Sequence, residues 1–157
     1  MELFGTKTLT MGSPMTGRAA PLSETPDRAF SAGKMGAGVV IFPTIGEVLS
    51  PCDGKVEFSF PKKYAVGMET EHDGVEFVIH VGIGTNALPD DCFELLAEPG
   101  QRVRRGDVLI RFDLARVEAQ GVPTATPFVF TNLDDGDLTV LRWGEVQAGD
   151  DLLEVRR

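Results

Sequence analysis

The sequence predicts a mainly β protein, a flattened antiparallel β-sandwich or barrel with two interleaved, duplicated halves and few, short helices. Three observations support this fold class. Short runs of β-branched and aromatic residues recur between turn signals. Eighteen glycines and ten prolines in 157 residues indicate many chain reversals. Two short motifs each occur twice, at separations of 37 and 43 residues.

The repeated motifs are the main sign of duplication. S-P-M-T-G at residues 13–17 is echoed by S-P-C-D-G at residues 50–54, and V-R-R-G-D-V-L-I at residues 103–110 by V-Q-A-G-D-D-L-L at residues 146–153. Each motif has a turn mechanism, because proline presets φ and glycine accepts a positive φ. Two copies indicate interleaved halves rather than a solenoid, which needs at least three repeats. Chance similarity between such short words is the alternative.

The other elements are predicted to be short. We expect residues 1–10 to be loosely held and residues 22–37, rich in Ser, Pro, Gly and Ala, to form a loop. Residues 91–97 are expected to form a helical turn that a Pro-Gly pair ends. Asp113 is a suitable N-cap for a short helix over residues 114–120, since its carboxylate can accept a bond from a first-turn amide.

Length and charge limit the domain count and the class of partner. Residues 1–157 are expected to form a single domain, because the chain is long enough to close one core. The net charge is −9 and the lysines and arginines are scattered, so nucleic acid is not an expected partner. No apolar stretch approaches the ~20 residues that span a bilayer.

The two cysteines, Cys52 and Cys92, bear on the cellular compartment. A chain of this size does not need a disulfide for stability, so free thiols in a reducing cytosol are the better interpretation. A single disulfide is the alternative. The first residues also lack the basic and then apolar pattern of a secretory signal. Together these features predict a cytoplasmic protein.

A single histidine, His80, lies within the apolar run of residues 75–83, which predicts a strand. Because side chains alternate along a strand, the odd-numbered residues of this run share one wholly apolar face. The even-numbered residues, which include Val78, His80 and Gly82, share the other face. His80 is therefore expected to project from a rigid, half-exposed surface rather than to sit in the core.

The strand of His80 is predicted to be half of a hairpin. Residues 71–74 form a turn cluster, and antiparallel closure around it places Tyr64 or Ala65 opposite His80. Tyr64 is then the best candidate for a side chain next to the imidazole. His72, at the tip of the hairpin, is too far along the strand to act with His80 and is interpreted as a turn residue.

Several roles can be weighed for His80. A metal site needs more ligands than the sequence places near it, and no G-x-S-x-G motif supports a Ser-His-Asp triad. A satisfied structural histidine is one interpretation. The other is a nucleophile, because an exposed imidazole is largely neutral near pH 7. A nucleophilic imidazole also needs a partner on its second nitrogen to fix the tautomer.

Five motifs together resemble the glucose-type enzyme IIA (EIIA) family of the bacterial phosphoenolpyruvate-dependent sugar phosphotransferase system. The central one is G-V-E-F-V-I-H-V-G-I-G-T, which is similar to the family's strand with the phospho-accepting histidine. The others are P-D-x-x-F, S-P-C-D-G, E-P-G-Q-R-V-R-R-G-D and T-P-F-V-F-T-N. In chain order the five lie at residues 26–30, 50–54, 74–85, 98–107 and 126–132.

The resemblance implies a fold, a reaction and partners. The fold is a flattened sandwich of the duplicated hybrid motif type. His80 would take a phosphoryl group from a histidine of the carrier HPr and pass it to a cysteine of a IIB domain or IIBC permease. No cofactor and no metal are implied. Val78 and Gly82 would allow close approach of a partner, and Thr85 would contact the rim of the site.

This sequence departs from the family pattern at two places near His80. The family's T-N-H segment aligns with Lys62-Lys63-Tyr64, so Tyr64 stands where a second histidine is found. Tyr64 is expected to donate a hydrogen bond to the phosphate, and Lys62 or Lys63 to supply positive charge unless both are solvated turn residues. Gly84 replaces an acidic residue. A regulatory or binding paralogue with impaired relay is therefore the alternative function.

Overall fold

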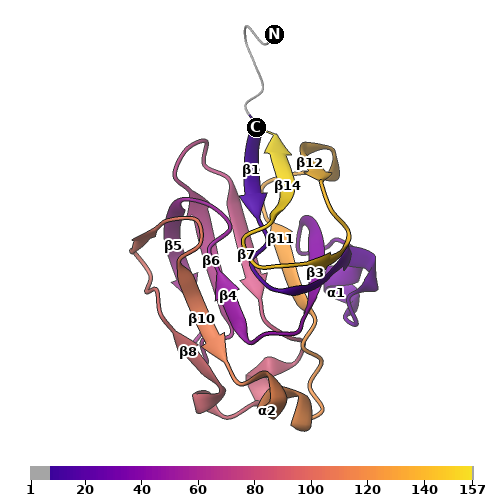
Figure 1. The fold of residues 1–157 in the computed structure, drawn as a ribbon, viewed down its shortest axis with the longest axis vertical. Helices are drawn as coiled ribbons and strands as arrows, with labels where there is room; N and C mark the ends of the chain where they lie inside the picture. Colours follow the sequence, from indigo (N-terminus) through magenta and orange to yellow (C-terminus); the bar gives the residue numbers. More distant parts are fainter. Residues whose placement is uncertain (1–7, 157) are drawn as a thin grey trace, which may run out of the picture.

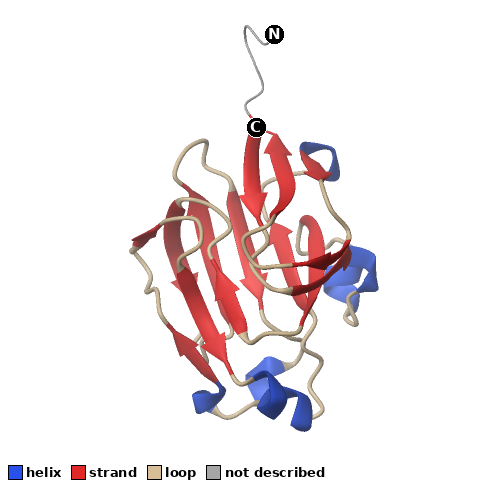
Figure 2. Ribbon diagram, viewed as in Figure 1, coloured by secondary structure: helices blue, strands red, loops and turns tan. Residues whose placement is uncertain are grey.

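The computed structural model describes residues 8–156, which form layered antiparallel sheets (Figure 1). An eight-stranded sheet has the order β13-β2-β3-β11-β7-β6-β5-β9. Two three-stranded sheets, β1-β14-β12 and β4-β10-β8, lie in front of it in Figure 1. The few helical segments lie at the periphery (Figure 2). The predicted mainly β sandwich is confirmed.

The strands are short, as the many turn residues predicted. The first seven are β1 (Thr8–Gly12), β2 (Gly17–Pro21), β3 (Ala37–Pro43), β4 (Glu47–Leu49), β5 (Gly54–Ser59), β6 (Ala65–Thr70) and β7 (Glu76–His80). The other seven are β8 (Phe93–Leu95), β9 (Arg102–Val103), β10 (Val108–Phe112), β11 (Thr126–Phe130), β12 (Leu138–Val140), β13 (Gly144–Val146) and β14 (Asp151–Arg156). The α-helices are α1 (Arg28–Ser31) and α2 (Leu114–Ala119), and the 3-10 turns are η1 (Leu22–Glu24), η2 (Thr85–Ala87), η3 (Asp90–Cys92) and η4 (Asp135–Asp137).

The duplication inferred from the motifs is visible in the strand pairing. In one copy β1 pairs with β14 and β2 with β13, and in the other β4 pairs with β10 and β5 with β9. The two S-P motifs connect β1 to β2 and β4 to β5. The two G-D motifs connect β13 to β14 and β9 to β10. Each half therefore takes strands from distant parts of the chain, as interleaved halves require.

The S-P turns repeat their hydrogen bonds bond for bond. Buried Ser13 donates its hydroxyl to the carbonyl of Met15 at 2.7 Å, and buried Ser50 donates to the carbonyl of Cys52 at 2.6 Å. The amide of Ser13 donates to Asp150 and that of Ser50 to Asp107, at 2.7 and 2.8 Å. A serine hydroxyl that bonds its own turn closes the reversal without leaving a buried polar group unpaired.

The fourth motif position shows the same bond made by different chemistry. In the first copy the Thr16 hydroxyl accepts from the amide of Ala148 at 2.9 Å. In the second copy a carboxylate oxygen of Asp53 accepts from the amide of Arg105 at 2.8 Å. The position therefore needs a side-chain acceptor rather than one residue type.

The two copies also join each other at their turns. The amide of Gly12 donates to the carbonyl of Pro51 at 2.9 Å, and the amide of Leu49 donates to the carbonyl of Pro14 at 2.8 Å. These reciprocal bonds hold the S-P turns of the two halves side by side. The core is thus centred on the paired turns and on the apolar faces of the sheets around them.

The core contains the predicted apolar face as far as Val81, whereas Ile83 is half-buried and lines the His80 cavity. Val75, Phe77, Ile79 and Val81 are at most 1% exposed. The ring of Phe77 packs edge-on against Phe128 of β11, with ring centres 5.5 Å apart. Burying each large apolar side chain stabilises the fold by about 1.5–3 kcal/mol, so this strand is firmly anchored.

Four boundary predictions are wrong, three of them within residues 22–97. The strand predicted over residues 75–83 ends at His80, because Gly82 turns the chain with a φ of 76°. Residues 91–97 form only part of a 3-10 turn before β8 begins, since β8 finds a partner in β10. Residues 22–37 are not only loop, because Asp27 caps α1 by accepting from the amide of Phe30 at 3.2 Å.

At the N-terminus, residues 8–10 belong to β1 rather than to a loose segment, because β14 pairs with them. Residues 1–7 lie outside the described residues. The predicted helix after Asp113 is confirmed as α2, with the Asp113 carboxylate accepting from the amide of Arg116 at 3.0 Å. Cys52 and Cys92 are free and buried. Over residues 8–156 the chain forms no helix with the length and apolar character that a membrane crossing requires.

Candidate functional site

His80 is the last residue of β7, and the alternation of the strand points its ring away from the core. Its neighbours Ile79 and Val81 are fully buried, whereas His80 is half-buried. Ala65 of β6 lies opposite His80, one of the two residues predicted for this position. The amide of Val81 donates to the carbonyl of Tyr64 at 2.8 Å, which extends the pairing one step past His80.

One nitrogen of the imidazole is held by the turn that follows it. His80 Nδ1 lies 2.8 Å from the carbonyl oxygen of Gly82. Since a carbonyl can only accept, this contact assigns the proton to Nδ1 and leaves the lone pair on Nε2. Within residues 8–156 Nε2 has no hydrogen-bond partner. The arrangement supplies the tautomer that a nucleophilic Nε2 requires.

Gly82 can occupy this place only because it lacks a side chain. Its φ of 76° is a conformation that other residues rarely adopt. A Cβ there would lie 2.6 Å from Cγ2 of Thr85 and 2.9 Å from the carbonyl oxygen of Pro123. Gly82 therefore positions the imidazole through its carbonyl. It does not form part of an open surface beside the imidazole, because Gly82 itself is buried.

Three aromatic rings surround the imidazole. The ring centres of Tyr64, Phe30 and Phe60 lie 5.1, 5.3 and 6.0 Å from that of His80. Phe60 also packs edge-on against Tyr64 at 5.2 Å. Partial burial by these rings lowers the pKa of His80 below its ordinary value of 6.5, because desolvation disfavours the imidazolium. The bond to Gly82 and the charge of Asp27 oppose this shift without reversing it.

A cavity of about 150 Å³ lies against the imidazole. Its wall combines the start of α1, the end of β7 and the following turn, through Asp27, Phe30, Tyr64, His80, Ile83, Gly84, Thr85 and Asn86. Thr85 is 1% exposed, and its hydroxyl is a buried polar group without a hydrogen-bond partner. A buried hydroxyl of this kind costs free energy unless a ligand binds it.

The comparisons with known proteins agree with this geometry. Residues 9–136 match the family model described as phosphoenolpyruvate-dependent sugar phosphotransferase system, EIIA 1. The chain belongs to this EIIA family. It is 41% identical over 143 residues to the glucoside-specific EIICBA component of the phosphotransferase system of Staphylococcus carnosus. That match covers 91% of this chain but only 20% of the relative, so the chain spans about a fifth of the relative's length.

The fold agrees with a solved member of the same system. The glucose permease IIA from Mycoplasma capricolum superimposes with a TM-score of 0.88 and 34% sequence identity. The match covers 98% of this chain and 99% of that one. The resemblance inferred from the five motifs is confirmed at the level of family and fold.

The lysines that precede Tyr64 in this EIIA chain have different surroundings. Lys62 Nζ donates to the carbonyl oxygens of Asn86 at 2.7 Å and Leu88 at 2.9 Å, so its ammonium is directed at the turn after β7. Lys63 is exposed and has a φ of 66°. The structure thus brings Tyr64 and Thr85 to the imidazole, and it engages Lys62 on a neighbouring loop.

The other predicted residues lie on the same sheet. Val78 is half-buried and faces outward two residues before His80, in register with Gly67 and Val129. His72 is exposed at the tip of the hairpin, as expected for a turn residue. Among residues 8–156, no three or more histidine, cysteine, aspartate or glutamate side chains are grouped to bind a metal ion.

Sequence reasoning did not assign a site role to Asp27, Phe30, Phe60 or Asn86. The P-D-x-x-F motif was the available signal for Asp27 and Phe30, because it is part of the family resemblance. Asp27 caps the short helix that places Phe30 on the imidazole. Phe60 and Asn86 carry no comparable signal, since each reaches the site through a turn whose path the sequence does not show.

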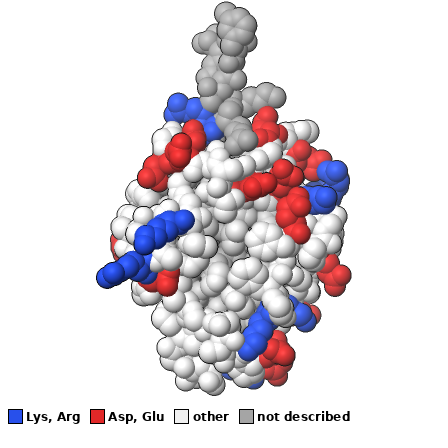
Figure 3. Space-filling view, turned by 180° about the vertical axis from the view of Figure 1, so that it is seen from behind, with Lys and Arg blue, Asp and Glu red and all other residues white. Residues whose placement is uncertain are grey.

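Charge is unevenly distributed over the outer face of the large sheet. Figure 3 shows this face from the side opposite to Figure 1, with charged side chains in its upper part and along its sides. Charged side chains also lie in the lower part, right of the midline, and the centre and lower left of the view are largely free of charge. Exposed Phe58 stacks on Phe60 with ring centres 6.0 Å apart and extends the aromatic group around His80 toward β5.

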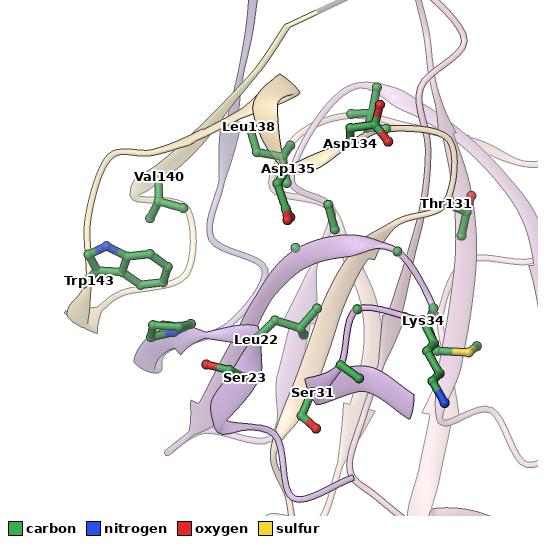
Figure 4. Close-up of a pocket in the computed structure, with 18 residues that line it drawn as sticks. Leu22, Ser23, Ser31, Lys34, Thr131, Asp134, Asp135, Leu138, Val140 and Trp143 are labelled. Carbon is green, nitrogen blue, oxygen red and sulfur yellow. The ribbon is translucent and has the colours of Figure 1, made fainter. Parts of the chain in front are cut away.

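A second and larger cavity, of about 710 Å³, lies elsewhere on the molecule (Figure 4). Trp143 and Val140 lie at one end of it and Lys34 at the other, with Asp135 directed inward between them. Trp143 is 50% exposed. No histidine or cysteine lines this cavity.

Proposed function

We propose that this chain is a cytoplasmic phosphoryl relay, in which His80 accepts a phosphoryl group from phospho-HPr and passes it to a IIB domain. The observation that carries the proposal is the hydrogen bond between His80 Nδ1 and the Gly82 carbonyl beside a cavity. It supports Nε2 as a nucleophile fixed on a rigid strand. Family membership supports the same reaction, because the matching model describes a sugar phosphotransferase system.

The acceptance step follows from the tautomer. The lone pair of His80 Nε2 attacks the phosphorus of the HPr phosphohistidine, a new N–P bond forms, and the N–P bond to HPr breaks. The HPr imidazole leaves with the electron pair of that bond. His80 keeps its Nδ1 proton and becomes more positive, and the Gly82 carbonyl 2.8 Å away stabilises that charge.

The donation step is a second in-line displacement, in which His80 is the leaving group. A cysteine thiolate of the IIB domain attacks phosphorus, an S–P bond forms, and the N–P bond to His80 breaks. Nε2 regains its lone pair, so His80 returns to its starting state. Both steps depend on in-line positioning and on donors for the phosphoryl oxygens.

Tyr64 and Thr85 are the donors that we assign to those oxygens. The Tyr64 ring lies edge-on to His80, and the Thr85 hydroxyl is buried beside the same cavity without a partner. A partner protein seated over the His80 cavity would exclude water and strengthen both bonds. Val78 and Phe58 would then belong to the contact surface.

The regulatory alternative rests on one specific feature. Tyr64 stands where the family pattern has a second histidine, and a phenol carries no charge near neutral pH. Both steps use the donors at the site, and donation to IIB is the step that we expect the missing cation to slow most. The two functions are therefore separated by the second transfer.

The test follows both transfers in sequence. The chain is incubated with phosphoenolpyruvate, the general phosphotransfer enzyme and HPr, and intact mass is measured. We expect one added phosphate in the wild type and in His72→Gln, and none in His80→Gln. A glucoside-specific IIB domain is then added. Loss of the phosphate from His80 supports the relay, and retention of it supports the regulatory alternative. Labelling of His80→Gln at the wild-type level would refute both.

A further inference from the structure

We propose that Lys62 is a positioning residue that fastens residues 84–90 as one wall of the His80 cavity. This inference rests on the proposed function of His80. Lys62 Nζ donates to Asn86 O at 2.7 Å and to Leu88 O at 2.9 Å. It also lies 4.0 Å from a carboxylate oxygen of Asp90. Its side chain is 35% exposed, so these bonds are partly shielded from water.

The segment depends on Lys62 because its other hydrogen bonds are internal. The amide of Ala87 donates to Gly84 at 3.2 Å and that of Leu88 donates to Thr85 at 3.0 Å. In the described part of the chain, the hydrogen bonds that tie residues 84–90 to another segment are those of Lys62. Buried Leu88 anchors the segment to the core, and the charge-assisted bonds across 24 and 26 residues fix its backbone to the turn between β5 and β6.

Between His80 and the segment the backbone turns at two glycines, and the amide of Ile83 between them donates to the carbonyl of Pro123 at 3.0 Å. Gly82 and Gly84 both have a φ of 76°, and a Cβ on Gly84 would meet no atom within 4 Å. Thr85, which carries the unpartnered hydroxyl, follows directly. Movement of the segment would carry Thr85 and Asn86 away from the imidazole, because both line the same cavity as His80.

Lys62 thus has a role that its alignment with the family's T-N-H segment does not suggest. Its ammonium acts on the reaction through the loop rather than by direct contact with the phosphoryl group. Holding the Thr85 hydroxyl in place before the partner arrives lowers the cost of ordering the site during transfer.

The first measurement needs no phosphoryl transfer. Hydrogen exchange of the Ala87 and Leu88 amides is followed by NMR in Lys62→Met, with Lys63→Met as the charge-matched neighbour. We expect exchange at both amides to rise about tenfold in Lys62→Met, since the turn opens more often without the charge-assisted bonds. Lys62→Arg should restore most of the protection, because a guanidinium can also donate to two carbonyls.

The second measurement is the rate of labelling by phospho-HPr. We expect kcat/KM to fall roughly three- to tenfold in Lys62→Met, to recover in Lys62→Arg, and to stay unchanged in Lys55→Met, an exposed lysine of β5. Unchanged exchange at Ala87 and Leu88 relative to Lys63→Met would overturn the positioning role. So would a rise no larger than that of core amides such as Val39, which would indicate general destabilisation.

The outcomes also separate this proposal from the proposed function. If exchange rises in Lys62→Met but the wild type never accepts phosphate, Lys62 still holds residues 84–90, and the proposed relay is refuted. Normal labelling of the wild type with unaltered exchange in Lys62→Met would do the opposite. If exchange rises but kcat/KM does not change, Lys62 holds the loop without serving the reaction, and the positioning role is refuted.

Discussion

The paired S-P turns and the His80 site are built in opposite ways. In the turns, the hydroxyls of Ser13 and Ser50 are buried and hydrogen-bonded, and the arrangement occurs twice. At the site, Thr85 has a buried hydroxyl without a partner, and burial lowers the pKa of His80. The difference teaches that the duplicated turns supply stability, while the single-copy site retains unfavourable features that a ligand can relieve.

The largest expected effect is at Gly82, where the site meets the scaffold. Gly82→Ala would place Cβ 2.6 Å from Thr85 and 2.9 Å from Pro123, in addition to the strain of a φ of 76°. We expect a loss of roughly 2–4 kcal/mol in the free energy of unfolding, because both overpacking and backbone strain act. Urea denaturation measures it.

Gly84→Ala is the matched control for Gly82→Ala. It has the same φ of 76° but no neighbouring atom within 4 Å, so only the backbone term of about 1 kcal/mol remains. Equal losses at the two glycines would show that contact with Thr85 and Pro123 does not matter.

Removal of either S-P hydroxyl should cost similar amounts. Ser13→Ala and Ser50→Ala each leave a buried carbonyl without its donor, at Met15 and Cys52. We expect each to lower the free energy of unfolding by about 1–3 kcal/mol, with unchanged phosphate labelling per folded molecule. If one serine matters and the other does not, the two turns are not energetically equivalent.

Thr85→Val should slow phosphate labelling without lowering the free energy of unfolding, the reverse of the two serine substitutions. The substitution keeps the shape and removes a hydroxyl that has no partner, so the free energy of unfolding should stay level or rise by up to ~1 kcal/mol. Labelling by phospho-HPr should slow by about tenfold if the hydroxyl donates to a phosphoryl oxygen. A marked loss of stability would contradict the view that this hydroxyl is unsatisfied.

The smallest effect concerns pH. Because the folded protein lowers the pKa of His80 below 6.5, the unfolded chain binds more protons just below that value. The stability that a neutral His80 contributes is complete above pH 6.5 and is lost as the pH falls through the folded pKa. His80→Gln should therefore lose less stability on acidification than the wild type, as thermal melts at several pH values will show. Parallel losses would contradict the lowered pKa.

The sequence predicted the parts of the fold that depend on local chemistry. The turn motifs, the Asp113 cap and the alternation around His80 are each decided by neighbours in the chain, and all three are confirmed. Two boundaries failed where a distant partner decides the outcome, and two failed at local features, the turn at Gly82 and the Asp27 cap. β1 and β8 exist because β14 and β10 pair with them, and neither pairing can be inferred from the short strands themselves.

The site was predictable to the same extent. The orientation of His80 and the closeness of Tyr64 follow from strand alternation and hairpin register. The sequence predicted that one ring nitrogen of His80 needs a partner. It did not predict that the partner is the carbonyl of Gly82, because that depends on the turn that Gly82 makes. The loop bonds of Lys62 were not foreseen, since they need the path of residues 84–90 in space.

The pairing of β1 with β14 has a consequence for how this unit can be attached to a neighbour. Thr8 lies opposite Arg156, so both ends of the described chain emerge at one pole, and β7 runs away from that pole toward His80 (Figure 1). A tether at either end would act as a single pivot on the far side from the imidazole. In the proposed relay, the length of that tether would set the effective concentration of His80 near its partners, as for linked modules.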